Sequence, residues 1–128
     1  MGQGDGKVIK VTTIDNPEYQ EFEDGYDFLK TGQVLHSYND KPSYIRYYKS
    51  NKIIICEQWY LDGKHHRSNN KPCSIGYYNN GRVCYKLWYL DSKKYSEQEY
   101  KQIMKQVKSM SDTEKLLDSR QWVREMAK

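Results

Sequence analysis

The chain has 128 residues and a formal net charge of +4, with 37% hydrophobic and 30% charged residues. This length favours one domain that buries a core, and no run approaches the roughly 20 apolar residues that a membrane span requires. The first residues lack the apolar block of a signal peptide, so we expect an intracellular, cytoplasmic protein.

The N-terminal quarter of the chain predicts one strand and an acidic segment. Residues 7–14 are rich in β-branched side chains and alternate in part, which is typical of a strand. The turn residues Asp15, Asn16 and Pro17 are expected to end it. Further on, residues 26–29 look like a degraded copy of a block that recurs later. Residues 1–25 are therefore predicted to precede an array of repeats that begins near residue 26.

The segment from Gly32 to Ser92 contains one pattern twice. The shared residues are His, Lys-Pro, Ile, Tyr-Tyr and Trp-Tyr-Leu-Asp, in that order, beginning at His36 and at His66. The closing blocks, at Trp59 and Trp88, lie 29 residues apart rather than 30, so the copies differ by one residue in a loop. Chance agreement in this order is improbable, and we interpret the two copies as structural repeats.

Each copy is predicted to form a β-hairpin. Its Lys-Pro pair bars a helix and begins an extended segment, and turns at residues 49–52 and 79–81 join that segment to a return strand over residues 53–61 or 82–90. Alternation along the return strands places six residues on one buried face: Ile55, Trp59, Leu61, Cys84, Trp88 and Leu90. Consecutive hairpins would then lie side by side as an antiparallel meander.

After Tyr95 the periodicity becomes helical. Ser96 and Glu99 have the spacing of a capping box, and apolar residues recur at helical spacing from Tyr100 onward. Further helical turns are predicted after Ser111 and Asp118. An apolar stripe needs a surface to cover, so the helices of residues 96–128 should pack on the sheet or seal the open end of the meander. The whole chain is predicted to be one α+β domain, with hairpin repeats over residues 26–95.

The repeats resemble the MORN-like hairpin repeats that are common in large DNA viruses and bacteriophages. The His, Pro, Ile, Tyr, Trp and Gly positions match the usual unit of that family, and His66-Arg67 keeps its His-Arg pair. Three departures are Ser37, Lys52 and Cys73, where the family has Arg, a turn Gly and Ala. The resemblance covers residues 26–95 and implies a hairpin-repeat architecture in a small, non-catalytic viral or phage protein that binds partners or acts as a scaffold.

Catalysis, a cofactor and a metal site are not predicted. Because His36 and His66 recur with the repeat, each is expected to bond the neighbouring turn rather than to act in catalysis. The three cysteines, Cys56, Cys73 and Cys84, have no close CxxC spacing and are expected to be small buried thiols. No base and orienting group can be assigned to a Cys nucleophile from the order of the residues. Metal binding and catalysis are the less favoured alternatives.

The favoured function is recognition of a host or viral protein. Residues 32–95 hold 11 bases and 4 acids, whereas residues 1–31 hold 3 bases and 7 acids. Tyr and Arg on an open sheet have the composition of protein interfaces. The predicted partner-binding residues are Tyr44, Arg46, Tyr48, Tyr60, Arg67, Tyr78 and Tyr89.

Two alternatives to this function stay open. The basic, Tyr-rich repeats could attract phosphate and stack nucleic-acid bases, although no ribonucleoprotein or helix-turn-helix signature accompanies them. An exposed edge strand could also pair with a partner strand or with a second copy of the chain, giving a homodimer. Steep salt dependence would distinguish nucleic-acid binding from an aromatic protein interface.

Overall fold

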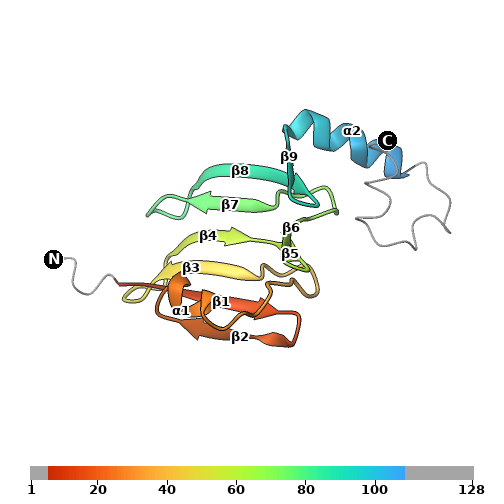
Figure 1. The fold of residues 1–128 in the computed structure, drawn as a ribbon. Helices are drawn as coiled ribbons and strands as arrows, with labels where there is room; N and C mark the ends of the chain where they lie inside the picture. Colours follow the sequence, from red (N-terminus) through yellow and green to blue (C-terminus); the bar gives the residue numbers. More distant parts are fainter. Residues whose placement is uncertain (1–5, 109–128) are drawn as a thin grey trace.

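The computed structural model describes residues 6–108, which form an antiparallel sheet with two helices (Figure 1). The strand order is β2-β1-β3-β4-β7-β8-β9, and β5 and β6 form a separate pair. The strands are β1 (Lys7–Thr13), β2 (Asn16–Phe22), β3 (Tyr44–Tyr48), β4 (Ile54–Gln58), β5 (Tyr60–Leu61), β6 (Lys64–His65), β7 (Ser74–Tyr77), β8 (Val83–Leu90) and β9 (Lys93–Tyr95). The helices are α1 (Gly25–Leu29) and α2 (Glu97–Lys108). The predicted α+β class and hairpin meander are confirmed.

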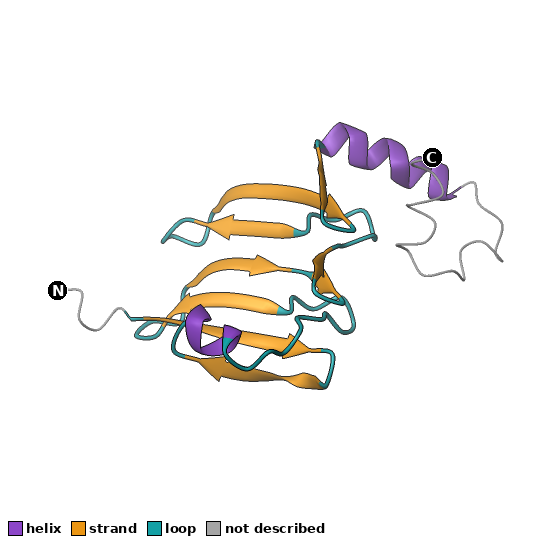
Figure 2. Ribbon diagram, viewed as in Figure 1, coloured by secondary structure: helices purple, strands orange, loops and turns teal. Residues whose placement is uncertain are grey.

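The two sequence copies form equivalent hairpins, β3-β4 and β7-β8, which pair through β4 and β7 (Figure 2). Both hairpins contain a bulge at the same place. In the first, Arg46 pairs with Cys56 and Tyr47 with Ile54, so that Ile55 is the extra residue. In the second hairpin the extra residue is Cys84, which lies 29 positions later. The copies therefore share an irregularity that hydrophobic periodicity does not show.

The bulges explain why the predicted buried face is only partly correct. Of its six residues, Trp59 and Leu90 are buried, three are partly buried, and Cys84 is exposed. The prediction assumed strict alternation, but an extra residue in a strand breaks the two-residue period. Cys84 is therefore wrongly predicted to be a buried thiol, whereas Cys56 and Cys73 are buried as predicted.

The N-terminal segment corrects two further expectations. Residues 7–13 form the predicted strand, but the acidic stretch that follows is also a strand, β2, with Pro17 inside it. Proline is tolerated there because β2 lies at the edge of the sheet. Residues 26–29, interpreted as a degraded copy of the closing block, lie in helix α1 instead. Asp24 caps this helix by accepting the backbone N–H of Asp27 at 2.9 Å, and Phe28 packs against the β1 side chains of the sheet.

Helix α2 seals one end of the meander. Its capping box is formed as predicted: Ser96 Oγ accepts the Glu99 N–H at 3.1 Å, and Glu99 Oε1 accepts the Ser96 N–H at 2.8 Å. Tyr100 and Met104 are buried against Leu90, and α2 follows directly after β9 (Figure 1). The helices predicted after Ser111 and Asp118 lie outside the described residues. Within residues 6–108, neither helix has the length and apolar character that a membrane crossing requires.

Candidate functional site

The repeated histidines hold the turns that close the two copies. His36 Nδ1 accepts the backbone N–H of Asp62 at 3.0 Å, and His66 Nδ1 accepts that of Asp91 at 2.8 Å. Both Asp residues have positive φ values, 49° and 52°. A side-chain acceptor at this point satisfies a backbone donor that the tight turn leaves without a strand partner. Each histidine therefore has the turn-bonding contact that the repeat predicted.

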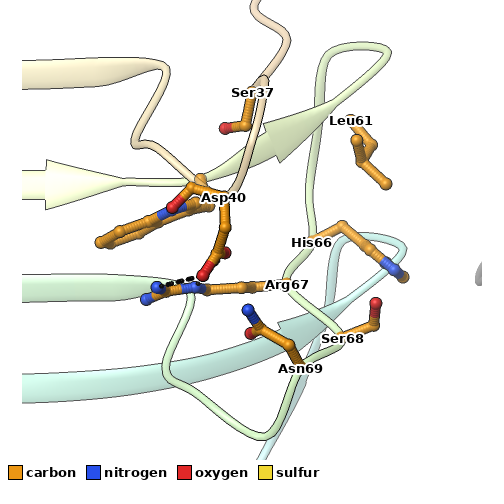
Figure 3. Close-up of a pocket in the computed structure, with 8 residues that line it drawn as sticks. Ser37, Asp40, Leu61, His66, Arg67, Ser68 and Asn69 are labelled. Atoms are coloured by element: carbon orange, nitrogen blue, oxygen red, sulfur yellow. Dashed lines mark hydrogen bonds and ion pairs between the residues drawn. The ribbon is translucent and has the colours of Figure 1, made fainter.

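A cavity of about 170 Å³ lies where the first copy meets the second (Figure 3). It is lined by Ser37, Asp40, Trp59, Leu61, His66, Arg67, Ser68 and Asn69. The Arg67 guanidinium lies 3.7 Å from the centre of the Trp59 ring. Its Nε and Nη2 donate to the two Asp40 carboxylate oxygens at 3.0 and 3.1 Å. We call Asp40, Trp59 and Arg67 the Arg67 cluster.

The Arg67 side chain makes its polar contacts within the protein. The Arg67 side chain is only 9% exposed, and its Nη1 donates to the Pro72 carbonyl at 3.0 Å. Burial raises the pKa of Asp40, but the hydrogen bonds from Arg67 and Asn69 and the nearby positive charges outweigh this and hold it below its usual value. Because the Arg67 guanidinium is already stacked on Trp59 and paired with Asp40, the cluster joins the two copies rather than presenting an unpaired arginine to a ligand.

The buried thiols beside this cluster are poor nucleophiles. The Cys73 thiol donates to the Trp59 carbonyl at 3.1 Å, and burial raises its pKa to about 12. Burial also raises the pKa of Cys56. A thiol is reactive as its thiolate, which these environments disfavour at neutral pH. Within residues 6–108, no three His, Cys, Asp or Glu side chains gather as a metal site would need.

The seven predicted partner-binding residues do not form one surface. Tyr78, 56% exposed, and Arg46 are exposed, whereas Tyr44, Tyr48, Tyr60 and Tyr89 are partly buried and Arg67 lies in its cluster. Tyr60 and Tyr89 lie on either side of His65, with ring centroids 4.3 and 4.7 Å from the imidazole. Burial between these rings lowers the pKa of His65.

Lysines lie over tyrosine rings on both faces of β3, because Tyr47 and Tyr48 are consecutive strand residues. Lys10 and Lys52 lie 5.3 and 5.5 Å from the centre of the Tyr47 ring, and Lys7 lies 5.9 Å from that of Tyr48. The Tyr47 hydroxyl donates to Glu21. Burial and this bond raise the pKa of Tyr47 to about 12. Rings engaged in this way are less free to stack on nucleic-acid bases.

The open surface lies on the last return strand. Residues 83–86 of β8 are all exposed, including Val83 at 46% and Tyr85 at 42%. Their strand pairs with β7 on one side, whereas β9 pairs only with Trp88, Tyr89 and Leu90. No strand within residues 6–108 covers the other side of residues 83–86, and we call this surface the β8 edge. Hydrophobic periodicity does not reveal this edge, because strict alternation places Cys84 on the buried face.

The opposite border of the sheet has a different composition. Strand β2 pairs with β1 alone among the described strands, and we call its outer side the β2 edge. It carries Pro17, Glu18 and Glu21, all exposed. Proline and charged side chains are the usual means by which edge strands avoid pairing with other proteins, and Pro17 and Glu18 lie in the first half of β2. Residues 20–22, in its second half, contain no proline. The acidic edge is therefore protected only in part, whereas the β8 edge is unprotected.

Comparison of the chain with known proteins found no matching family model, no matching curated protein and no matching solved structure. The resemblance to MORN-like repeats accordingly stays a prediction from the residues quoted for it.

Proposed function

We propose that this chain is a non-enzymatic, repeat-based recognition and scaffold module of a virus or phage, and that it binds a host or viral protein. The observation that supports the proposal is the β8 edge. Its strand presents backbone donors and acceptors with no pairing strand among residues 6–108, and it carries the exposed side chains of Val83 and Tyr85. An extended segment of a partner can add to such an edge, with backbone hydrogen bonds for affinity and side chains for specificity.

The bulge and Gly76 prepare this edge. Gly76 lies opposite Tyr85 across the hairpin, and the Tyr85 ring occupies the space where a Cβ of residue 76 would be. The ring therefore lies over β7 and stays exposed, which gives a flat apolar surface on the sheet face next to the β8 edge. Aromatic side chains held in this way lose little entropy on binding and are frequent anchors of protein interfaces.

The proposal is tested by charge insertion on the β8 edge with a matched control. Val83→Glu adds a negative charge on that edge, whereas Leu29→Glu adds the same charge on α1, at a side chain that is 73% exposed. Tagged wild-type protein and both variants are used for affinity capture from infected and uninfected cells, and the affinity of each captured protein is then measured. We expect Val83→Glu to weaken binding by at least about tenfold and Leu29→Glu to leave it unchanged.

Three outcomes would contradict the proposal. Partners that bind both variants as they bind wild type would remove the β8 edge from recognition. Binding that is lost on nuclease treatment and weakens steeply with salt would favour the nucleic-acid alternative. Turnover of a substrate, with activity lost in Cys84→Ala but kept in Leu29→Glu, would make the protein an enzyme.

A further inference from the structure

We infer that the β8 edge binds the β2 edge of a second copy, so that the protein associates with itself head to tail. This inference rests on the proposed function of the β8 edge and names its occupant. Three properties of the sheet carry it: strand direction, charge, and the side chains that the two edges present on each face.

Strand direction allows the two edges to join. Every neighbouring pair from β2 through β1, β3, β4 and β7 to β8 is antiparallel. Strands β2 and β8 therefore run in opposite directions. When β2 of a second copy lies beside β8, the alternation continues without interruption, and the new pair has the same antiparallel geometry as β4 with β7.

The charges of the two edges are complementary. Residues 15–27, which contain β2, hold six acids and no base, whereas residues 82–86 hold two bases, Arg82 and Lys86, and no acid. Joining two β8 edges, or two β2 edges, would bring like charges together. A contact between unlike edges attracts instead, and electrostatic complementarity of this kind selects the orientation in which partners bind.

The pairing across the sheet also fixes which side chains would meet. A continuous series of paired residues links Glu21 to Lys10, Ile45, Glu57, Ile75 and Lys86. Because paired residues share a face, Glu21 and Lys86 project from the same side of the sheet. A second series links Phe22 to Ile9, Arg46, Cys56, Gly76 and Tyr85 on the other side.

One register brings opposite charges together. When Lys86 of one copy lies opposite Glu21 of the next, the two form an ion pair of the kind that stabilises cross-strand contacts. Residues 20–22 of the second copy then lie opposite residues 85–87, and the contact ends there because β9 already pairs with Trp88, Tyr89 and Leu90. The Phe22 and Tyr85 rings keep their places against Phe28 and over Gly76 of their own sheets. Because the contact joins two different surfaces, an open array keeps one unused edge at each of its two ends. The association is therefore heterologous and produces open chains or rings rather than only a two-fold dimer.

Charge reversal tests this register directly. Lys86→Glu alters the β8 edge and Glu21→Lys alters the β2 edge. Lys101→Glu, on the exposed part of α2, is the control with the same change in charge as Lys86→Glu. Since Glu21 also accepts a bond from Tyr47, Glu23→Lys serves as a second variant directly after β2, where Glu23 is exposed and pairs with Lys49 at the surface. Circular dichroism verifies that each variant folds.

Analytical ultracentrifugation of the full chain gives the result. We expect wild type and Lys101→Glu to form oligomers that grow with concentration and dissociate as salt rises. Lys86→Glu and Glu21→Lys alone should each associate at least about tenfold more weakly. An equal mixture of these two should associate again, because every contact between unlike variants restores one pair of opposite charges.

Other results would overturn the inference. These are a wild-type monomer throughout the range from about 1 μM to about 1 mM, a closed dimer that both reversals leave intact, and a mixture of folded variants that stays dissociated. If wild type is monomeric and Val83→Glu still loses a captured partner, self-association is contradicted and the proposed function is kept. If the protein associates with itself but no captured partner depends on Val83, the proposed function is contradicted and self-association is kept.

Discussion

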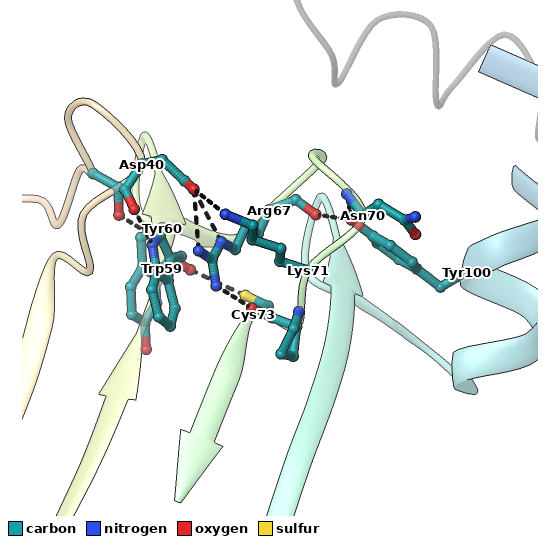
Figure 4. Close-up of polar contacts among 10 residues, drawn as sticks. Asp40, Trp59, Tyr60, Arg67, Asn70, Lys71, Cys73 and Tyr100 are labelled. Carbon is teal, nitrogen blue, oxygen red and sulfur yellow. Dashed lines mark hydrogen bonds and ion pairs between the residues drawn. The ribbon is translucent and has the colours of Figure 1, made fainter. Parts of the chain in front are cut away.

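The two sequence copies have the same backbone but different covers over the same tryptophan position. Trp59 of the first copy is 5% exposed. Its ring lies under the guanidinium of Arg67 from the second copy, and this guanidinium also donates to the Asp40 carboxylate (Figure 4). Trp88 of the second copy is only partly buried and meets Tyr100 of α2, with ring centroids 6.5 Å apart. The repeat thus determines the hairpin, whereas the element that follows determines how deeply its tryptophan is buried.

Helix α2 packs against the second copy in the same way that the second copy packs against the first. The Tyr100 hydroxyl donates to the Arg67 carbonyl at 2.6 Å and accepts the Asn70 N–H at 3.1 Å (Figure 4). These contacts satisfy backbone groups of the loop before β7. A cap of a repeat array must both cover apolar surface and bond exposed backbone groups, and one tyrosine does both here.

The largest difference between the copies should appear when each tryptophan is removed. Trp59→Ala should lower the free energy of unfolding by about 3–5 kcal/mol, because a large buried side chain is lost. The change also removes the hydrogen bond from Trp59 Nε1 to the Asp40 carbonyl. Trp88→Ala should cost less, since Trp88 is only partly buried. Urea denaturation followed by circular dichroism measures both, and equal losses would contradict the difference in cover.

Removal of the two repeated histidines should also cost different amounts of stability, with the larger loss for the more deeply buried one. His66 is buried, at 2% exposure, whereas the His36 side chain is 25% exposed. His66→Ala leaves the N–H of Asp91 without its acceptor and should cost about 2–3 kcal/mol. His36→Ala should cost less, because water can reach the N–H of Asp62. The free energies of unfolding of the two variants test this, and a larger loss for His36→Ala would contradict it.

The pairs Arg46–Cys56 and Gly76–Tyr85 occupy equivalent positions in the two hairpins. Gly76→Ala places a Cβ where the Tyr85 ring lies and should cost about 1–2 kcal/mol, because the ring must move. Adding Tyr85→Ser should recover most of that loss. A double-mutant cycle in urea measures the coupling. Additive effects would show that the ring does not depend on the glycine.

The closing turns offer a change that should stabilise the protein. Gly63 and Ser92 are equivalent residues with φ values of 81° and 68°. Glycine is favoured in this region, which strains other residues. Ser92→Gly should therefore raise the free energy of unfolding by about 0.5–1 kcal/mol. Gly63→Ala is the opposite control, since its Cβ would lie 2.9 Å from Val34 Cγ1. A lower stability of Ser92→Gly would contradict the equivalence of the turns.

The smallest expected difference depends on pH. His65 of the second copy is equivalent to Leu35 of the first, and burial lowers the pKa of His65 below 6.5. The unfolded chain therefore binds the proton more readily, so this residue should decrease stability as pH falls through 6.5 toward the lower folded pKa. His65→Leu should remove that part of the slope. Thermal melts of both proteins between pH 7 and about pH 5 test it, and identical slopes would exclude His65 as the source.

The local elements were largely readable from the sequence. The Lys-Pro starts, the hairpin turns, the Ser96–Glu99 capping box and the strand at residues 7–13 all depend on contacts within a few residues. The role of the histidines was also accessible, because a residue that recurs with the repeat is expected to serve the architecture.

The features that local patterns predicted wrongly depend on neighbours in space. Strand β2 contains proline and acidic residues, and it becomes a strand because β1 offers a pairing edge. The bulge at Cys84 exposes a thiol that strict alternation buries. The candidate β8 edge was missed for the same reason: only the order of strands shows that β8 has no further neighbour among residues 6–108 along its first half.

The sequence by itself determined that two copies of one hairpin unit lie in series and that a helix follows them, because repeated residues and turn chemistry act over short distances. The tertiary structure alone decided which tryptophan is buried, which tyrosines remain open and which edge of the sheet is unprotected. These properties depend on residues that are far apart in the chain, such as Arg67 against Asp40 or Tyr100 against Arg67, and no local pattern encodes such pairs.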